Sequence, residues 1–72
     1  MTVWEYKTIL EEYEKDHWVI ISDGKVYEKG TLRNDVFNSL GSEGWELVTS
    51  NASENNFMYI FKRPLAKLEG GF

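Results

Sequence analysis

The segment from Leu40 to Val48 constrains the fold of this chain more than any other stretch of the sequence. It follows a run of apolar residues at helical spacing, contains Gly41 and Gly44, and continues through Trp45 into residues that favour a strand. Glycine readily adopts the left-handed backbone conformation that often follows a helix, so the two glycines predict a helix end and a turn. We therefore expect a helix, a tight turn and a strand, in that order, in the middle of the chain.

The other elements are predicted from periodicity and turn residues. Thr31 is the expected N-cap of the helix, whose apolar stripe consists of Leu32, Val36, Phe37 and Leu40. Alternating or β-branched side chains predict strands over residues 3–10, 18–22, 25–28, 45–49 and 57–62. Asp23-Gly24 favours a hairpin turn between the second and third strands. The acidic residues 11–16 are expected to form a loop.

Together these elements predict an α+β fold, in which a small antiparallel β-sheet (β-ββ-α-ββ) carries one helix packed on one face. Residues 1–66 are expected to form the single domain and residues 67–72 a flexible C-terminal tail. A domain of this size buries only about 60% of its unfolded surface. The chain has no cysteine for a disulfide, so dense aromatic packing or oligomerisation is expected to stabilise it.

Alternation along the strands divides their side chains into two sets, and both sets are apolar. We expect one face to carry Trp4, Tyr6, Trp45, Leu47, Phe57, Tyr59 and Phe61. We expect the other to carry Val3, Ile9, Val48, Met58 and Ile60. A helix about 15 Å long covers only one face, so we expect a homo-oligomer, with a dimer as first choice. The alternative is that the acidic segment, the tail or the hairpin over residues 18–28 covers the remaining apolar side chains.

Three short motifs occur in order along the chain: Trp4-Glu5-Tyr6-Lys7, the segment from Leu40 to Val48, and Phe61-Lys62-Arg63-Pro64. In this order and spacing they make the chain resemble the small bacterial and phage proteins grouped as the domain-of-unknown-function family numbered 4177. The resemblance covers about residues 2 to 65 and implies a compact α+β domain. It implies no catalytic residues, because the role of the family is unassigned.

Several polar groups could support catalysis or metal binding, and a structural interpretation is favoured for each. His17 has only the adjacent Asp16 as an orienting partner, and neighbouring strand residues point apart, so a surface histidine is favoured. Two sets of carboxylates remain, a divalent-cation site of Glu11, Glu12, Glu14 and Asp16 and an acid–base pair from Glu5, Glu43 and Glu46. The first set lacks the loop geometry and glycine of a calcium site. Nothing in the sequence assigns distinct acid and base roles within the second.

Two further patterns are reminiscent of ligand sites. Gly41 and Gly44 follow a helix, whereas phosphate-binding glycines precede one, so helix termination is the favoured interpretation. Lys62 and Arg63, with Lys7 and Lys67, accompany an aromatic strand, as in single-stranded nucleic-acid binders. The net charge of −4 and the need for aromatic side chains in the core oppose that function.

The function predicted first is a non-enzymatic module that self-associates through its sheet and binds a partner. A small-ligand or nucleotide binder with a pocket between subunits comes second, and a carboxylate-based hydrolase or transferase third. No cofactor or metal site is expected. The candidate ligand or interface residues are Trp18, Tyr27, Trp45, Met58 and Ile60. The sequence lacks an apolar run of the roughly 20 residues that a membrane span requires, so we expect a cytoplasmic location without a membrane partner.

Overall fold

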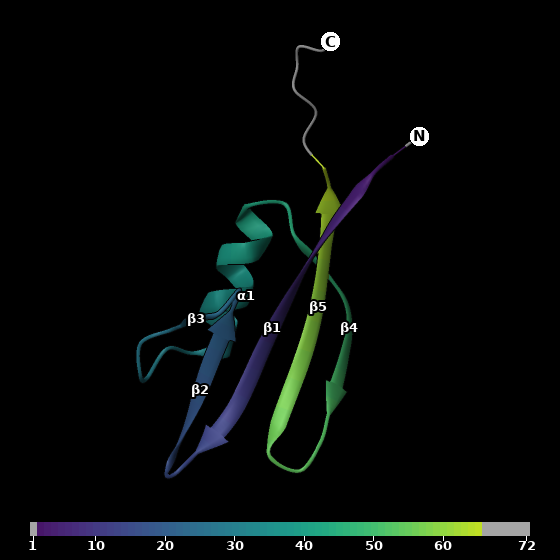
Figure 1. Cartoon of the computed structure of the whole chain (residues 1–72). Helices are drawn as coiled ribbons and strands as arrows, with labels where there is room; N and C mark the ends of the chain where they lie inside the picture. The colour runs from purple at the N-terminus through teal and green to yellow at the C-terminus, as the bar shows by residue number, and fades with distance from the viewer. Residues whose placement is uncertain (1, 66–72) are drawn as a thin grey trace.

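The computed structural model describes residues 2–65, which form a five-stranded antiparallel sheet with one helix (Figure 1). This confirms the predicted α+β class. The elements are β1 (Trp4–Glu14), β2 (His17–Ser22), β3 (Lys25–Val26), α1 (Arg33–Ser42), β4 (Glu46–Ala52) and β5 (Asn56–Pro64). The strand order is β3-β2-β1-β5-β4, so β1 lies at the centre and pairs with β2 and β5. The tail expected over residues 67–72 lies outside the described residues.

The acidic segment is not the loop expected from its composition. Strand β1 continues to Glu14, and the turn to β2 is formed by Lys15 and Asp16, with Lys15 at φ 58°. Glu11 pairs with β2 on one side and with β5 on the other. Strand β1 is paired along both edges, and the Glu11 carboxylate has hydrogen-bond donors beneath the helix. These contacts outweigh the low strand propensity of glutamate. The prediction of a loop was therefore wrong, and β1 is the longest strand of the sheet.

The predicted hairpin at Asp23-Gly24 is confirmed. Both turn residues have positive φ, 53° and 77°, as a type I′ turn requires. Strand β3 is shorter than expected and contains only two residues. Ile21 pairs with Val26, so this hairpin joins the main sheet as its short edge.

The helix ends one turn later than the sequence suggested. Gly41 lies inside α1, and Gly44 at φ 92° is the left-handed residue. The amide of Gly44 donates to the Gly41 carbonyl and the amide of Trp45 to the Leu40 carbonyl, both at 3.0 Å. This pair of bonds is a Schellman motif. It turns the chain so that Trp45 enters the core directly after the helix.

The beginning of α1 also differs from the expectation. Leu32 is the N-cap, and it contributes no side-chain capping bond. The hydroxyl of Thr31, the expected cap, donates instead to the Glu28 carbonyl at 2.7 Å. Thr31 therefore stabilises the turn before the helix rather than its first amides.

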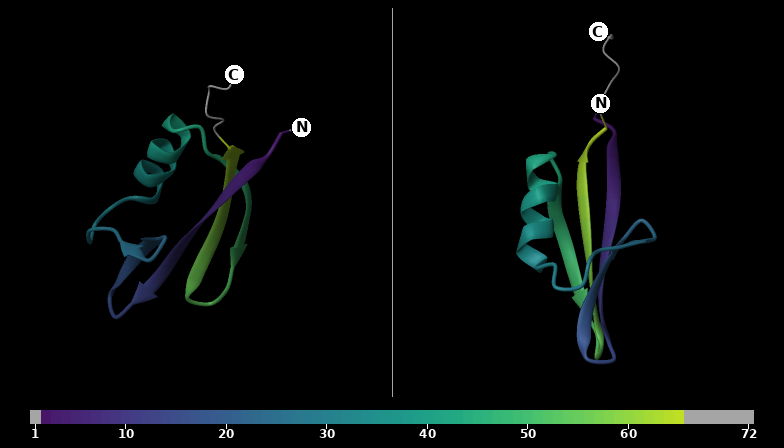
Figure 2. Two further views of the ribbon diagram at one scale, coloured as in Figure 1. Left: turned by 45° about the horizontal axis from the view of Figure 1, so that its top comes forward. Right: turned by 90° about the vertical axis from the view of Figure 1, so that its left-hand side faces the viewer.

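The core lies between α1 and one face of the sheet (Figure 2, right). Its buried apolar residues are Ile9, Ile20, Val36, Leu40, Trp45, Tyr59 and Phe61. The ring of Phe37 meets Tyr59 and Phe61 edge-on, at 4.9 Å and 5.2 Å between centroids. Edge-to-face contacts of this kind stabilise a small core beyond the area that they bury.

The two faces of the sheet differ from the predicted sets. Ile9 pairs with Tyr59 and is buried beneath the helix, whereas Trp4 and Tyr6 lie on the opposite side of β1. Trp4 and Tyr6 were expected on one face with Tyr59 and Phe61, and Ile9 on the other with Met58 and Ile60, and both assignments were wrong. The register between β1 and β5 sets the relative phase of their alternation, and this pairing is not visible within either strand alone. In β4 a register shift between Leu47 and Thr49 changes the phase again.

Candidate interface on the open face of the sheet

The side of the sheet away from α1, here called the open face, has no helix over it (Figure 2, right). Its centre is an apolar patch formed by Leu10, Ile21, Met58 and Ile60. Cross-strand pairing makes the patch continuous, because Leu10 lies between Ile21 on β2 and Met58 on β5. All four side chains are half-buried by their neighbours alone. A continuous apolar patch that crosses three strands is the kind of surface that marks an interface.

The two ends of the open face carry opposite charges. At one end Lys62 lies over the ring of Trp4, with its Nζ 4.0 Å from the ring centroid. Tyr6, the register partner of Lys62 on β1, is 64% exposed. At the other end Glu12 and Glu14 follow Leu10 on the same side of β1. Lys62 also faces Glu46 across the β4–β5 pairing, so the basic end is partly neutralised, whereas no ion pair within residues 2–65 involves Glu12 or Glu14.

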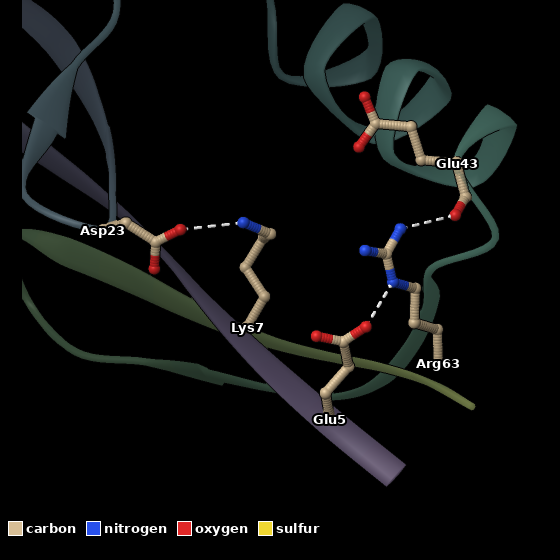
Figure 3. A network of polar contacts seen from close by, with 5 residues as sticks. All are labelled: Glu5, Lys7, Asp23, Glu43 and Arg63. Carbon is tan, nitrogen blue, oxygen red and sulfur yellow. Dashed lines mark hydrogen bonds and ion pairs between the residues drawn. The ribbon is translucent and has the colours of Figure 1, made fainter. Parts of the chain in front are cut away.

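The helix side of the sheet holds a polar network at the end of α1 (Figure 3). The guanidinium of Arg63 donates to the Glu5 carboxylate at 2.8 Å and to the Glu43 backbone carbonyl at 2.8 Å. Lys7 pairs with Asp23 at 2.7 Å. Since both cations already have partners, this network joins β1, β5, the β2–β3 turn and the helix end rather than presenting a free anion site.

Trp45 packs beneath the cations of this network. The guanidinium carbon of Arg63 is 4.3 Å from the ring centroid of Trp45, and the Lys7 amine is 5.2 Å from it. The three motifs noted in the sequence thus meet here: Lys7 belongs to the first, Trp45 to the second and Arg63 to the third. On the helix side, the contacts of Lys7, Trp45 and Arg63 therefore stabilise the fold. Trp4, Tyr6 and Lys62, from the same motifs, remain at the surface of the open face.

A second polar cluster lies deeper beneath the helix. Glu11 is 6% exposed, and its Oε1 accepts hydrogen bonds from Arg33 Nε at 2.9 Å and from the Tyr59 hydroxyl at 3.1 Å. Burial raises the pKa of Tyr59, and the hydrogen bond to Glu11 raises this pKa further, because ionisation would place two negative charges together. The cluster keeps a carboxylate inside the core by supplying it with donors.

The raised pKa of Tyr59 gives a pH prediction. The native state holds the hydroxyl proton more tightly than the unfolded chain, so the stabilisation is complete below pH 10 and is lost as pH rises through the native pKa. We expect the free energy of unfolding to fall above pH 10 in urea titrations. Tyr59→Phe should be less stable at neutral pH and show a shallower alkaline decline. An unchanged decline in Tyr59→Phe would assign it to other groups.

The predicted site residues are distributed among several surroundings. Met58 and Ile60 lie together on the open face. Trp45 is buried, and Tyr27 packs against the core. Trp18 lies on the helix side at the far end of the sheet, with its ring 5.2 Å from Tyr13 and 5.5 Å from Phe57. The five residues therefore do not form one site. Leu10 and Ile21, which complete the open patch, were missed, although their alternation with buried Ile9 and Ile20 was the available signal.

The acidic and histidine candidates are dispersed. Alternation points Glu11 toward the helix and Glu12 and Glu14 to the open face. Asp16 lies in a turn and contacts His17 Nδ1 at 3.0 Å, contrary to the expectation that these neighbours would point apart. That hydrogen bond lowers the pKa of the Asp16 carboxyl. Within residues 2–65, no group of three acidic, histidine or cysteine side chains is placed to hold a metal ion.

Two further observations bear on ligands and membranes. A shallow depression of about 220 Å³ lies beside the β4–β5 turn, lined by Asn51, Ala52, Ser53, Asn56 and Met58. It is open to solvent, so it differs from the enclosed clefts that bury most of a small ligand. No helix in the described part of the chain has the length and apolar character needed to cross a membrane.

Comparison with known proteins gives one match. A family model described as Domain of unknown function (DUF4177) matches residues 4–64. The match extends from the first residue of β1 to the last residue of β5. No curated protein and no solved structure matches the chain.

Proposed function

We propose that this chain, which belongs to the DUF4177 family, is a non-enzymatic module that self-associates through the open face of its sheet. The observation that carries the proposal is the apolar patch of Leu10, Ile21, Met58 and Ile60, which crosses three strands opposite the helix. A second copy would remove this patch from water, and apolar burial drives most protein association. Symmetric dimers are the most common solution for a single chain.

The charges at the ends of the open face favour one orientation of the second copy. If the strands of the two copies ran in the same direction, Glu12 would lie over Glu12 of the partner. A two-fold axis between the sheets and perpendicular to the strands reverses the partner, so that Glu12 lies toward the partner's Lys62. The cross-strand pair of Leu10 and Met58 then packs on the cross-strand pair of Thr8 and Ile60 of the other copy. Aligned packing of two sheets about 10 Å apart is a common arrangement of this kind.

The non-enzymatic part of the proposal is supported by the engagement of two candidate carboxylates, Glu5 and Glu11. Glu5 is bound by Arg63, whereas Glu43 contributes only its backbone carbonyl to that guanidinium. Glu11 is held by Arg33 and Tyr59. Groups that are saturated by partners within the fold are poor candidates for general acids or bases, which must reach a substrate proton.

Substituting Leu10 by lysine tests the face contact. In sedimentation equilibrium at micromolar concentration, we expect the unmodified protein to show at least twice the 8.4 kDa mass of one chain. Leu10→Lys should halve the mass of the assembly, with a dissociation constant raised by at least about 100-fold, because it buries an unpaired charge. Lys62 already occupies this face, so the sheet itself should tolerate a lysine.

Leu32→Lys is the matched control, because Leu32 is 64% exposed and lies at the start of the helix. It should leave the mass unchanged, and far-ultraviolet circular dichroism should show that both variants are folded. A single-chain mass for the unmodified protein would contradict the proposal. So would a Leu10→Lys variant with an unaltered mass.

A further inference from the structure

Two opposite charges of the open face lie at equal distances from the centre of its apolar patch. Along β1, Tyr6 comes three residues before Ile9 and Glu12 three residues after it. Lys62 is the register partner of Tyr6, so this cation and the Glu12 carboxylate flank the level of Ile9 symmetrically. The members of the apolar patch occupy the levels immediately before and after Ile9. The patch and both charges are therefore arranged about a single centre.

Neither Lys62 nor Glu12 takes part in an ion pair within residues 2–65. The Lys62 amine lies over the Trp4 ring, 4.0 Å from its centroid, and a cation–π contact leaves the charge of an ammonium in place. Glu46 faces Lys62 across the β4–β5 pairing without forming an ion pair with it. The exposed hydroxyl of Tyr6 lies beside this cation on β1. The basic end therefore offers an ammonium and a hydroxyl as donors to a carboxylate.

We propose that Tyr6 and Lys62 of each copy bind the Glu12 carboxylate of the other copy, and that this pair of equivalent contacts determines which chain is accepted as the partner. The inference rests on the face contact proposed above, whose two-fold axis at the level of Ile9 exchanges the levels of Tyr6 and Glu12. Strand β5 separates β4 from β1, so Glu46 lies outside the contact. Charge complementarity of this kind contributes to partner choice and orientation more than to affinity.

The contact gives a role to the motif residues that the fold leaves at the surface. Lys7 and Arg63, from the first and third motifs noted in the sequence, contact the Trp45 ring on the helix side. Tyr6 and Lys62 come from the same two motifs and lie on the open face. The two motifs thus stabilise the fold on one side of the sheet and select the partner on the other.

Exchanging the two charges tests this contact. In sedimentation equilibrium at low salt, Lys62→Glu and Glu12→Lys should each raise the dissociation constant of the dimer at least about 10-fold, because each sets like charges together at both ends. Both substitutions in one chain should restore the dissociation constant of the unmodified protein, since opposite charges meet again. An equimolar mixture of the two single variants, one of them labelled with heavy nitrogen, should give mainly mixed dimers in native mass spectrometry.

Lys25→Glu is the matched control, because Lys25 is exposed and lies on the helix side with its register partner Ser22. It changes the net charge as Lys62→Glu does and should leave the dissociation constant unchanged. Far-ultraviolet circular dichroism should show that the variants are folded. Lys62→Gln and Glu12→Gln introduce no like charges and repeat the test if a charge reversal unfolds the chain. Once one of them is present, the other should weaken association no further.

The outcomes separate the failure of this contact from the failure of the face contact. If Leu10→Lys separates the chains while both charge reversals associate as tightly as the unmodified protein, the charge contact is overturned and the face contact stands. A combined variant that associates no better than the single reversals, or a mixture without mixed dimers, has the same meaning. A single-chain mass for the unmodified protein would overturn both.

Discussion

Replacing Trp45 by alanine is expected to lower the free energy of unfolding by about 3–5 kcal/mol. The ring is 7% exposed and belongs to the core beneath α1. The change would also remove the aromatic surface under Arg63 and Lys7, so the cost includes both a cavity and two cation contacts. Small domains have a total stability of about 5–15 kcal/mol. Urea unfolding followed by circular dichroism should therefore show a variant that is barely folded.

Trp18→Ala provides the matched control for this loss. Trp18 is 41% exposed and contacts the rings of Tyr13 and Phe57. Truncating it leaves a cavity that water can fill, so we expect a cost of about 1 kcal/mol. Equal costs for the two variants would show that Trp45 does not contribute as a packed core residue. The comparison uses the same chemical change in two surroundings and therefore isolates the effect of burial.

The local elements of this fold were predictable because their signals lie within a few residues of sequence. The Asp23-Gly24 turn requires positive φ at both positions, and the apolar stripe of the helix recurs at helical spacing. Which of Gly41 and Gly44 adopts the left-handed conformation could not be decided from the neighbouring sequence. Both glycines can end a helix, and the choice depends on the packing that brings Trp45 back onto Leu40.

The assignment of the faces failed because it depends on contacts between distant residues. Each strand showed alternation, yet alternation within β1 does not reveal whether Ile9 or Tyr6 lies beside Tyr59. The prediction of a loop over residues 11–16 failed for the same reason. Their acidic composition predicts a solvated segment, whereas Glu11 is buried with Arg33 and Tyr59, which lie 22 and 48 residues away in sequence.

The existence of a second apolar face could be predicted from the sequence, but only some of the residues that form it could be named. One short helix cannot cover two apolar faces, so the sequence predicts a second face that another segment or another copy must cover. Met58 and Ile60 were assigned to it, while Leu10 and Ile21 were not singled out. Trp18 and Tyr27 are large aromatic residues of the hairpin over residues 18–28, whose position in the sheet the sequence does not specify. Their surroundings were decided by the pairing of that hairpin with β1.

Replacing Arg33 by alanine is expected to lower the free energy of unfolding by about 3 kcal/mol, which is large for a residue whose side chain is 46% exposed. The cost comes from its partner. The Glu11 side chain is 8% exposed, and without Arg33 its negative charge would keep only the Tyr59 hydroxyl as a donor. A buried charge without a counter-charge destabilises more than a pair of exposed ions stabilises. Asp23→Asn, which breaks the exposed pair with Lys7, should cost less than about 1 kcal/mol.

The decisive measurement is a double-mutant cycle with Glu11→Gln. In the unmodified protein, Glu11→Gln removes the charge that Arg33 binds and should destabilise the fold. In the Arg33→Ala background the same change removes an uncompensated buried charge while its amide oxygen still accepts the Tyr59 bond. It should therefore stabilise that variant by about 1–2 kcal/mol. The effect of one substitution would reverse in sign, which independent contributions do not produce. Additive losses would mean that Glu11 is solvated in the folded protein and that β1 is held by its backbone pairing with β2 and β5 alone.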